Sequence, residues 1–194
     1  MIIRGPAGEL EAQLDVAKNE KAITAALCHP HPQYGGSMHD AVLQTVATAL
    51  LSRGVNCLRF NFRGVGGSDG RFDNGVGEAE DLRSVCEWIA LEYPRDKLWL
   101  AGYSFGASIV WQTLADVNPA RVLLVAPPVG RMDFSRPAPD GIEIHAVAGD
   151  RDDFVDLNQF ETWTGVTTTV IAGADHFFAS HQAELAEAVE QAIA

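Results

Sequence analysis

The stretch KLWLAGYSFG, residues 97–106, decides the fold, because an apolar run there ends in a G-x-S-x-G pattern. Residues 97–101 have the composition of a buried strand, and residues 105–117 have the apolar spacing of a helix. On the sharp turn between them, side chains at Gly102 and Gly106 would collide with neighbouring backbone. We therefore predict a strand, a tight turn and a helix, with the hydroxyl of Ser104 exposed as a nucleophile. The alternative is a serine that only caps the helix between two packing glycines.

The rest of the chain alternates short apolar runs with longer helical patterns. The expected strands are residues 10–17, 23–28, 55–60, 97–101, 122–126, 142–148 and 166–172, and the expected helices are residues 40–53, 78–92, 105–117 and 178–194. This alternation predicts an α/β fold with a mostly parallel, twisted sheet and helices on both faces, formed as one domain over residues 1–194. In such a sheet, the loops at the carboxyl ends of the strands carry the chemistry.

A serine nucleophile needs a base that a carboxylate orients, and histidine is the usual base. His176 directly follows the expected strand 166–172. The other two histidines downstream of Ser104 are His145, inside an expected strand, and His181, inside the expected last helix. We therefore predict His176 as the base.

The orienting carboxylate is expected in the loop after residues 142–148, where Asp150, Asp152 and Asp153 are available. The order of the elements alone leaves the choice among them open. The same loop places acidic residues at positions 1, 3, 7 and 12 of a calcium-binding pattern. However, the sixth position of that pattern needs glycine and is Val155 here, so a calcium site is poorly supported.

The order of serine, aspartate and histidine along the chain resembles that of the α/β-hydrolase fold. Within it, the chain is similar to small, lidless, dienelactone-hydrolase-like serine hydrolases, which carry the motif H-P-H-P-x-x-G-G, here residues 29–36. Residues 62–68 are similar to their F-R-G-x-G-x-S loop. The resemblance implies hydrolysis more firmly than it implies a substrate. It also implies that the acid is the aspartate of G-x-x-D-x-x-V, which is Asp152 here, with Asp153 as the second choice.

The negative charge that develops during acyl transfer needs two backbone N–H groups, which form an oxyanion hole. The first is expected from Phe105, directly after the nucleophile, and the second from the loop after residues 23–28. The prolines of that loop have no N–H, so we expect Gln33 or Tyr34 to supply the second group, just before a pair of glycines.

His29 and His31 of the same loop could be two metal ligands, but the prolines beside them favour a rigid turn that one histidine holds by a hydrogen bond. The sequence has no G-x-G-x-x-G that opens a helix, no G-x-x-x-x-G-K and no C-x-x-C pair. We therefore expect neither a metal nor another cofactor. Cys28, Cys57 and Cys86 stand in apolar surroundings and are expected to be buried, reduced thiols.

The composition indicates which classes of binding partner are unsuited to this protein. The chain has 14 Lys and Arg against 26 Asp and Glu, and the net charge of −12 repels nucleic acid and anionic membrane surfaces. Glu9 and Glu11 stand where a signal peptide needs an apolar run, and no apolar stretch approaches the ~20 residues of a membrane helix. We expect a cytoplasmic protein that acts on a small molecule, and the sequence leaves the oligomeric state open.

Many proteins of the α/β-hydrolase fold carry a lid where this chain has only residues 127–141, with four prolines, between two expected strands. The site is therefore expected to be open and shallow, suited to small or extended soluble esters and thioesters. The expected function is a serine carboxyl-ester hydrolase that works through an acyl-enzyme. A cofactor-free perhydrolase would use the same residues. The alternative from a different class is a non-catalytic scaffold that serves as a binding or interaction module.

Overall fold

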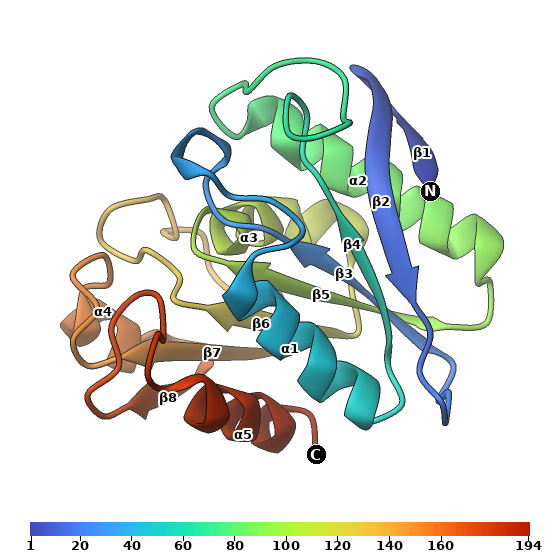
Figure 1. Ribbon diagram of the computed structural model, residues 1–194. Helices are drawn as coiled ribbons and strands as arrows, with labels where there is room; N and C mark the ends of the chain where they lie inside the picture. The colour runs from blue at the N-terminus through green and yellow to red at the C-terminus, as the bar shows by residue number, and fades with distance from the viewer.

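The computed structural model describes all 194 residues and contains one sheet of eight strands (Figure 1). The strands are β1 (Ile2–Gly5), β2 (Gly8–Asp15), β3 (Ile23–Cys28), β4 (Asn56–Phe60), β5 (Lys97–Tyr103), β6 (Arg121–Val125), β7 (Glu143–Gly149) and β8 (Thr167–Ile171). Their order across the sheet is β1-β2-β4-β3-β5-β6-β7-β8. Strands β3 to β8 are parallel, and β2 pairs antiparallel with both β1 and β4. The predicted mostly parallel sheet is confirmed.

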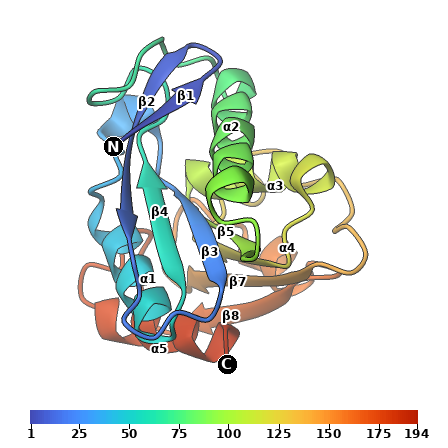
Figure 2. The ribbon, with the colours of Figure 1, turned by 90° about the vertical axis from the view of Figure 1, so that its right-hand side faces the viewer.

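Helices cover both faces of this sheet, also as predicted. They are α1 (Ala41–Ser52), α2 (Val76–Glu92), α3 (Phe105–Val117), α4 (Leu157–Glu161) and α5 (Gln182–Ala192). Figure 2 shows α2 and α3 on one side of the sheet and α1 and α5 on the other. The central strands are therefore buried on both sides, which is why their sequences are continuously apolar.

Each face of the sheet has its own apolar core. In β5, Leu100 belongs to the core under α2 and α3, whereas Ala101 belongs to the core under α1 and α5. Leu82 of α2 fills the first core and Leu43 of α1 fills the second, and both side chains are fully buried. Burying one leucine contributes roughly 2 kcal/mol, so each helix layer is held by many such side chains together.

The structure differs from the sequence pattern at both ends of the chain and at one short helix. The pattern predicts neither β1, which forms a hairpin with β2 through Gly5 and Gly8, nor α4, whose 5 residues are too few to show a helical period. The last helix begins at Gln182 and not at residue 178. The reason is that Phe178 has a φ of 50° and is fully buried, so the chain turns there before the helix can start.

The three cysteines are buried with free thiols, as expected. Burial raises the pKa of Cys57 and of Cys86 to about 12, which makes both thiols poor nucleophiles. None of the helices combines the length and the apolar character that crossing a membrane requires.

His29, directly after β3, is fully buried and links the ends of two strands. Its Nε2 accepts a hydrogen bond from the Phe62 N–H at 3.0 Å, and its Nδ1 lies 2.7 Å from the Pro30 carbonyl oxygen, which can only accept. These partners require the neutral ring with the proton on Nδ1. Burial lowers the pKa of His29 to about 4.

The buried neutral state of His29 predicts a loss of stability in acid. An unfolded histidine binds its proton near pH 6.5, so the contribution of His29 is complete above that pH and is lost as the pH falls from 6.5 to about 4. The loss is on the order of 3 kcal/mol. Urea denaturation of His29→Gln at pH 7 and at pH 4.5 should show a smaller difference in unfolding free energy than the parent protein shows. His39→Gln, at an exposed histidine, is the control and should keep the parent's difference. Equal pH dependence in His29→Gln and the parent would contradict the assignment.

Candidate active site

Ser104 lies on a strained turn between β5 and α3. Its φ of 54° and ψ of −118° place it in a backbone conformation that side-chain-bearing residues rarely adopt. A Cβ atom at Gly102 would lie 2.4 Å from the Gly106 carbonyl oxygen, and one at Gly106 would lie 2.2 Å from the Cys28 carbonyl oxygen. The two glycines of the G-x-S-x-G pattern are therefore required by close backbone contacts, as the sequence predicts.

Ser104, His176 and Asp152 come together in one hydrogen-bonded line. His176 Nε2 lies 2.9 Å from Ser104 Oγ, and His176 Nδ1 lies 2.8 Å from Asp152 Oδ2. Because the carboxylate accepts, Nδ1 carries the proton and Nε2 is left to accept from the serine hydroxyl. The three residues come from the loops after β5, β7 and β8, and the side chains of His176 and Asp152 are buried.

Among the three aspartates of the loop after β7, only Asp152 contacts His176. Its Oδ1 also accepts a hydrogen bond from the Phe154 N–H at 2.8 Å, which fixes the carboxylate. Asp150 Oδ1 instead accepts from the Gly173 N–H at 2.6 Å and ties this loop to the loop after β8. Asp153 is exposed, and the structure gives its side chain no hydrogen-bond partner.

Tyr103 is a further residue of the candidate site, and no pattern in the sequence indicates it. Its hydroxyl donates a hydrogen bond to the backbone carbonyl of His176 at 3.0 Å, and its ring lies 5.5 Å from the imidazole ring. Burial raises the pKa of Tyr103 well above its ordinary value, so the hydroxyl keeps its proton and remains a donor. Tyr103 is the residue before Ser104 in the G-x-S-x-G pattern, and only the fold brings it beneath His176.

The loop after β3 is a tight 3₁₀ turn over Pro32–Tyr34. The Gln33 N–H donates to His31 Nδ1 at 3.2 Å, and the Tyr34 N–H donates to the His31 carbonyl oxygen at 3.1 Å. Both amides that the sequence favours for the oxyanion hole are therefore engaged within the turn. The amides of His31 and of Phe105 make no hydrogen bond in the structure, and the two side-chain rings lie 4.9 Å apart.

The two histidines of this loop are held by the protein. Both ring nitrogens of His29 have backbone partners, and Nδ1 of His31 accepts from the Gln33 amide. Nowhere in the structure do three side chains of the types His, Cys, Asp or Glu gather closely enough to hold a metal ion. The loop therefore acts as a rigid turn beside Phe105.

Exposed aromatic rings surround the nucleophile. The rings of Phe154 and Phe177 lie 4.6 and 5.4 Å from the imidazole of His176, and both side chains are well exposed. Tyr34, also exposed, packs 4.6 Å from the ring of His31. Three exposed aromatic rings packed against His176 and His31 form an apolar rim, and exposed apolar patches of this kind are typical of ligand-binding surfaces.

Comparison with known proteins is consistent with this geometry. A family model described as serine aminopeptidase, S33, matches residues 24–145. A lidless α/β serine hydrolase from Xanthomonas campestris is 37% identical, with a TM-score of 0.93 over 100% of this chain and 92% of that chain. An α/β serine hydrolase homologue from Coxiella burnetii is 40% identical, with a TM-score of 0.95 over 100% of this chain and 96% of that chain. An uncharacterised protein of Rickettsia prowazekii is 35% identical over 202 residues, which cover 95% of this chain and 84% of that protein. The chain therefore belongs to the α/β-hydrolase family, among the serine hydrolases that have no lid.

Proposed function

We propose that the protein hydrolyses carboxylic esters or thioesters through a covalent acyl-enzyme on Ser104. The observation that carries the proposal is the line of two hydrogen bonds from Ser104 Oγ through His176 to Asp152, at 2.9 and 2.8 Å. A serine hydroxyl is a weak nucleophile until a base takes its proton, and this arrangement supplies the base and its orienting carboxylate.

In the first step, Ser104 Oγ attacks the carbonyl carbon while its proton passes to His176 Nε2. The bond to the leaving alcohol or thiol then breaks, and His176 returns the proton to that group. In the second step, a water molecule attacks the acyl-enzyme, His176 takes the water's proton, and the bond to Oγ breaks as the proton returns to Ser104. Asp152 holds the imidazole in the required tautomer and stabilises its charged form in both steps.

For the oxyanion hole, we propose the backbone N–H groups of Phe105 and His31. Both are free of partners, and the packing of their rings at 4.9 Å places the two residues next to each other. The Phe105 N–H also belongs to the first turn of α3, where the helix dipole favours negative charge. The engaged amides of Gln33 and Tyr34 would have to break their hydrogen bonds in the turn before they could take this role.

The open rim of the site favours substrates that lie across the surface. An acyl-enzyme mechanism would equally allow an amide substrate, so the leaving group has to be tested directly. A panel of short-chain p-nitrophenyl esters, acyl thioesters and aminoacyl anilides, assayed with the purified protein, separates these classes. The alternative function, a non-catalytic binding scaffold, predicts no turnover with any of them.

Ser104 should react with a fluorophosphonate probe, because the His176 base is within hydrogen-bond distance of its hydroxyl. Intact mass spectrometry should show a single addition to the parent protein, and peptide mapping should place it on Ser104. Ser104→Ala should show no addition. Labelling that persists in this variant would rule out the assigned nucleophile, and an unlabelled parent protein would favour the scaffold.

Asp152→Asn should lower kcat by about 10⁴-fold near neutral pH, because an asparagine at this position favours the wrong histidine tautomer. Asp153→Asn is the matched control, since it makes the same chemical change on the adjacent, exposed side chain. It should stay within about threefold of the parent. Steady-state kinetics on the best ester of the panel measures both variants, and circular dichroism checks their folding. A larger loss in Asp153→Asn would reverse the assignment.

Tyr103→Phe should lower kcat by roughly tenfold with little change in KM, because the His176 backbone loses the hydrogen bond that positions it. The variant should also lose about 1–3 kcal/mol of stability, since a buried carbonyl is left unpaired. Thr113→Val is the control for stability alone, because its buried hydroxyl bonds only within α3. It should unfold more easily while keeping its kcat. An unchanged kcat in Tyr103→Phe would show that this tyrosine is merely structural.

A further inference from the structure

A cleft of about 580 Å³ lies between α4 and the segment that joins β6 to β7. From its sequence, we expect this segment to leave the site open and shallow. In the structure, the segment also forms a hollow of its own beside the site. The volume falls within the range of small-molecule sites in proteins. The side chains of its lining that matter here are Arg131, Asp133, Phe134, Arg136 and Trp163.

We propose that this cleft is a second subsite, which binds the far end of the substrate, and that this end is a flat aromatic ring carrying a negative charge. The inference rests on the proposed function, because it assigns a substrate class to the Ser104 site. It is carried by three features: the aromatic wall of the cleft, its unpaired arginine and its position relative to Ser104.

The wall of the cleft is aromatic and firmly supported. Phe134 and Trp163 meet edge to face, with ring centroids 5.2 Å apart and an interplanar angle of 86°. Both pack on Trp111 of α3, at 5.9 and 4.6 Å. Trp111 is 4% exposed, and its Nε1 is the one buried side-chain polar atom without a hydrogen-bond partner in the structure. Trp163 is only half-buried, so part of its ring remains open to a ligand that stacks on it.

The charge available in the cleft is positive. Arg136 is exposed and makes neither a salt bridge nor a hydrogen bond in the structure. Arg131 donates from Nε and Nη2 to the Asp153 carbonyl oxygen, at 3.1 and 2.6 Å. The Asp133 carboxylate accepts from the N–H and hydroxyl of Ser135, which lower its pKa and keep it ionised. Two arginines and one aspartate give the lining itself a charge of +1, and the Asp156 carboxylate lies beside it, accepting from Nε2 of the lining residue Gln159 at 2.9 Å. The group that an anion would meet in the cleft is therefore the unpaired, exposed guanidinium of Arg136.

The cleft lies within reach of a substrate held at Ser104. Trp111 stands seven residues after Ser104 on α3, which is about 10 Å along a helix. On the surface, the Arg131 guanidinium lies 5.6 Å from the ring of Phe154, and that ring lies 4.6 Å from His176. Phe154 thus forms an exposed apolar surface between the candidate base and the mouth of the cleft. A substrate that spans about 10 Å would cross Phe154, with its ester at Ser104 and its aromatic ring at Trp163.

The indole N–H groups allow a direct binding test, because Trp163 lines the cleft and packs on Trp111, whereas Trp88 and Trp99 lie on α2 and β5. Phenylacetate is titrated into ¹⁵N-labelled full-length protein, and the neutral isostere phenylacetamide is titrated in parallel. We expect saturable shifts of the Trp163 and Trp111 signals and none of the Trp88 and Trp99 signals. The dissociation constant should be about threefold lower for phenylacetate than for phenylacetamide, as expected for one exposed charge pair.

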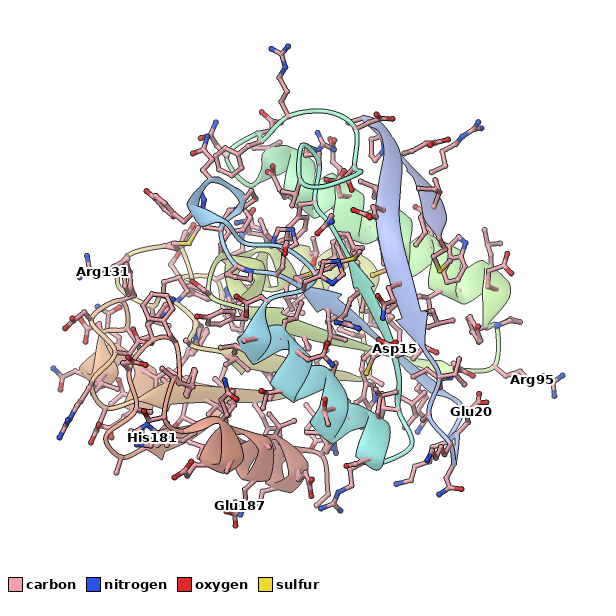
Figure 3. All side chains as sticks on the ribbon, viewed as in Figure 1. Asp15, Glu20, Arg95, Arg131, His181 and Glu187 are labelled. Atoms are coloured by element: carbon pink, nitrogen blue, oxygen red, sulfur yellow. The ribbon has the colours of Figure 1, made fainter.

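Arg136→Gln should abolish the preference for phenylacetate, and Arg95→Gln should leave it intact. Arg95 is an exposed arginine on the opposite side of the molecule from Arg131 (Figure 3). No shift of Trp163, equal affinity for the two ligands, or an unchanged preference in Arg136→Gln would each overturn the proposal. Because neither ligand is an ester, the result is independent of turnover. Fluorophosphonate labelling of Ser104 in the same samples therefore separates a failure of the subsite from a failure of the hydrolase assignment.

Discussion

The close approach of α3 to the ends of β3 and β5 is the constraint on which the site depends. At this crossing, backbone touches backbone, and a Cβ on Gly106 would lie 2.2 Å from the Cys28 carbonyl oxygen. The approach is possible only because both positions two residues from Ser104 lack side chains. It forces the positive φ of Ser104, whose strain the surrounding sheet and helix must hold. The same approach places Phe105 beside the loop after β3, and so brings the two free amides together.

Backbone hydrogen bonds between the strand ends set the level of the three loops that form the candidate active site. The Ser104 N–H donates to the Val125 carbonyl at 2.9 Å, the Ala126 N–H to the Val147 carbonyl at 2.7 Å, and the Asp150 N–H to the Ile171 carbonyl at 3.2 Å. Parallel pairing thus continues one residue past the ends of β5, β6 and β7. The loops that carry Ser104, Asp152 and His176 leave the sheet at one level, and this is why residues 72 and 24 apart in sequence can share one imidazole.

The F-R-G-x-G-x-S loop, residues 62–68, holds neighbouring elements of the fold together. It is part of the family resemblance, but its side chains bond to the protein itself. Arg63 donates to the buried Asp81 carboxylate of α2, with the Nη2–Oδ1 pair at 2.8 Å. Ser68 Oγ donates to the Asn61 carbonyl at 2.7 Å and accepts from the Glu11 N–H at 2.9 Å. Removing one partner of a buried ion pair costs about 3–5 kcal/mol, so this loop anchors α2 and β2 to the end of β4.

The sequence by itself determined the alternation of strands and helices, the turn at Ser104 and the candidate base, because apolar periodicity and glycine spacing are local properties. It left three aspartates open, and the family pattern that favoured Asp152 is a statement about spacing. Only the tertiary structure decided which carboxylate reaches His176, because that depends on how the loop after β7 folds back toward β8. It also decided that the Gln33 and Tyr34 amides are engaged, that Tyr103 lies beneath His176, and that residues 127–141 form a cleft with α4. These contacts join residues that are far apart in the chain. Their distances are fixed by side-chain packing across the sheet, and no local sequence pattern encodes that packing.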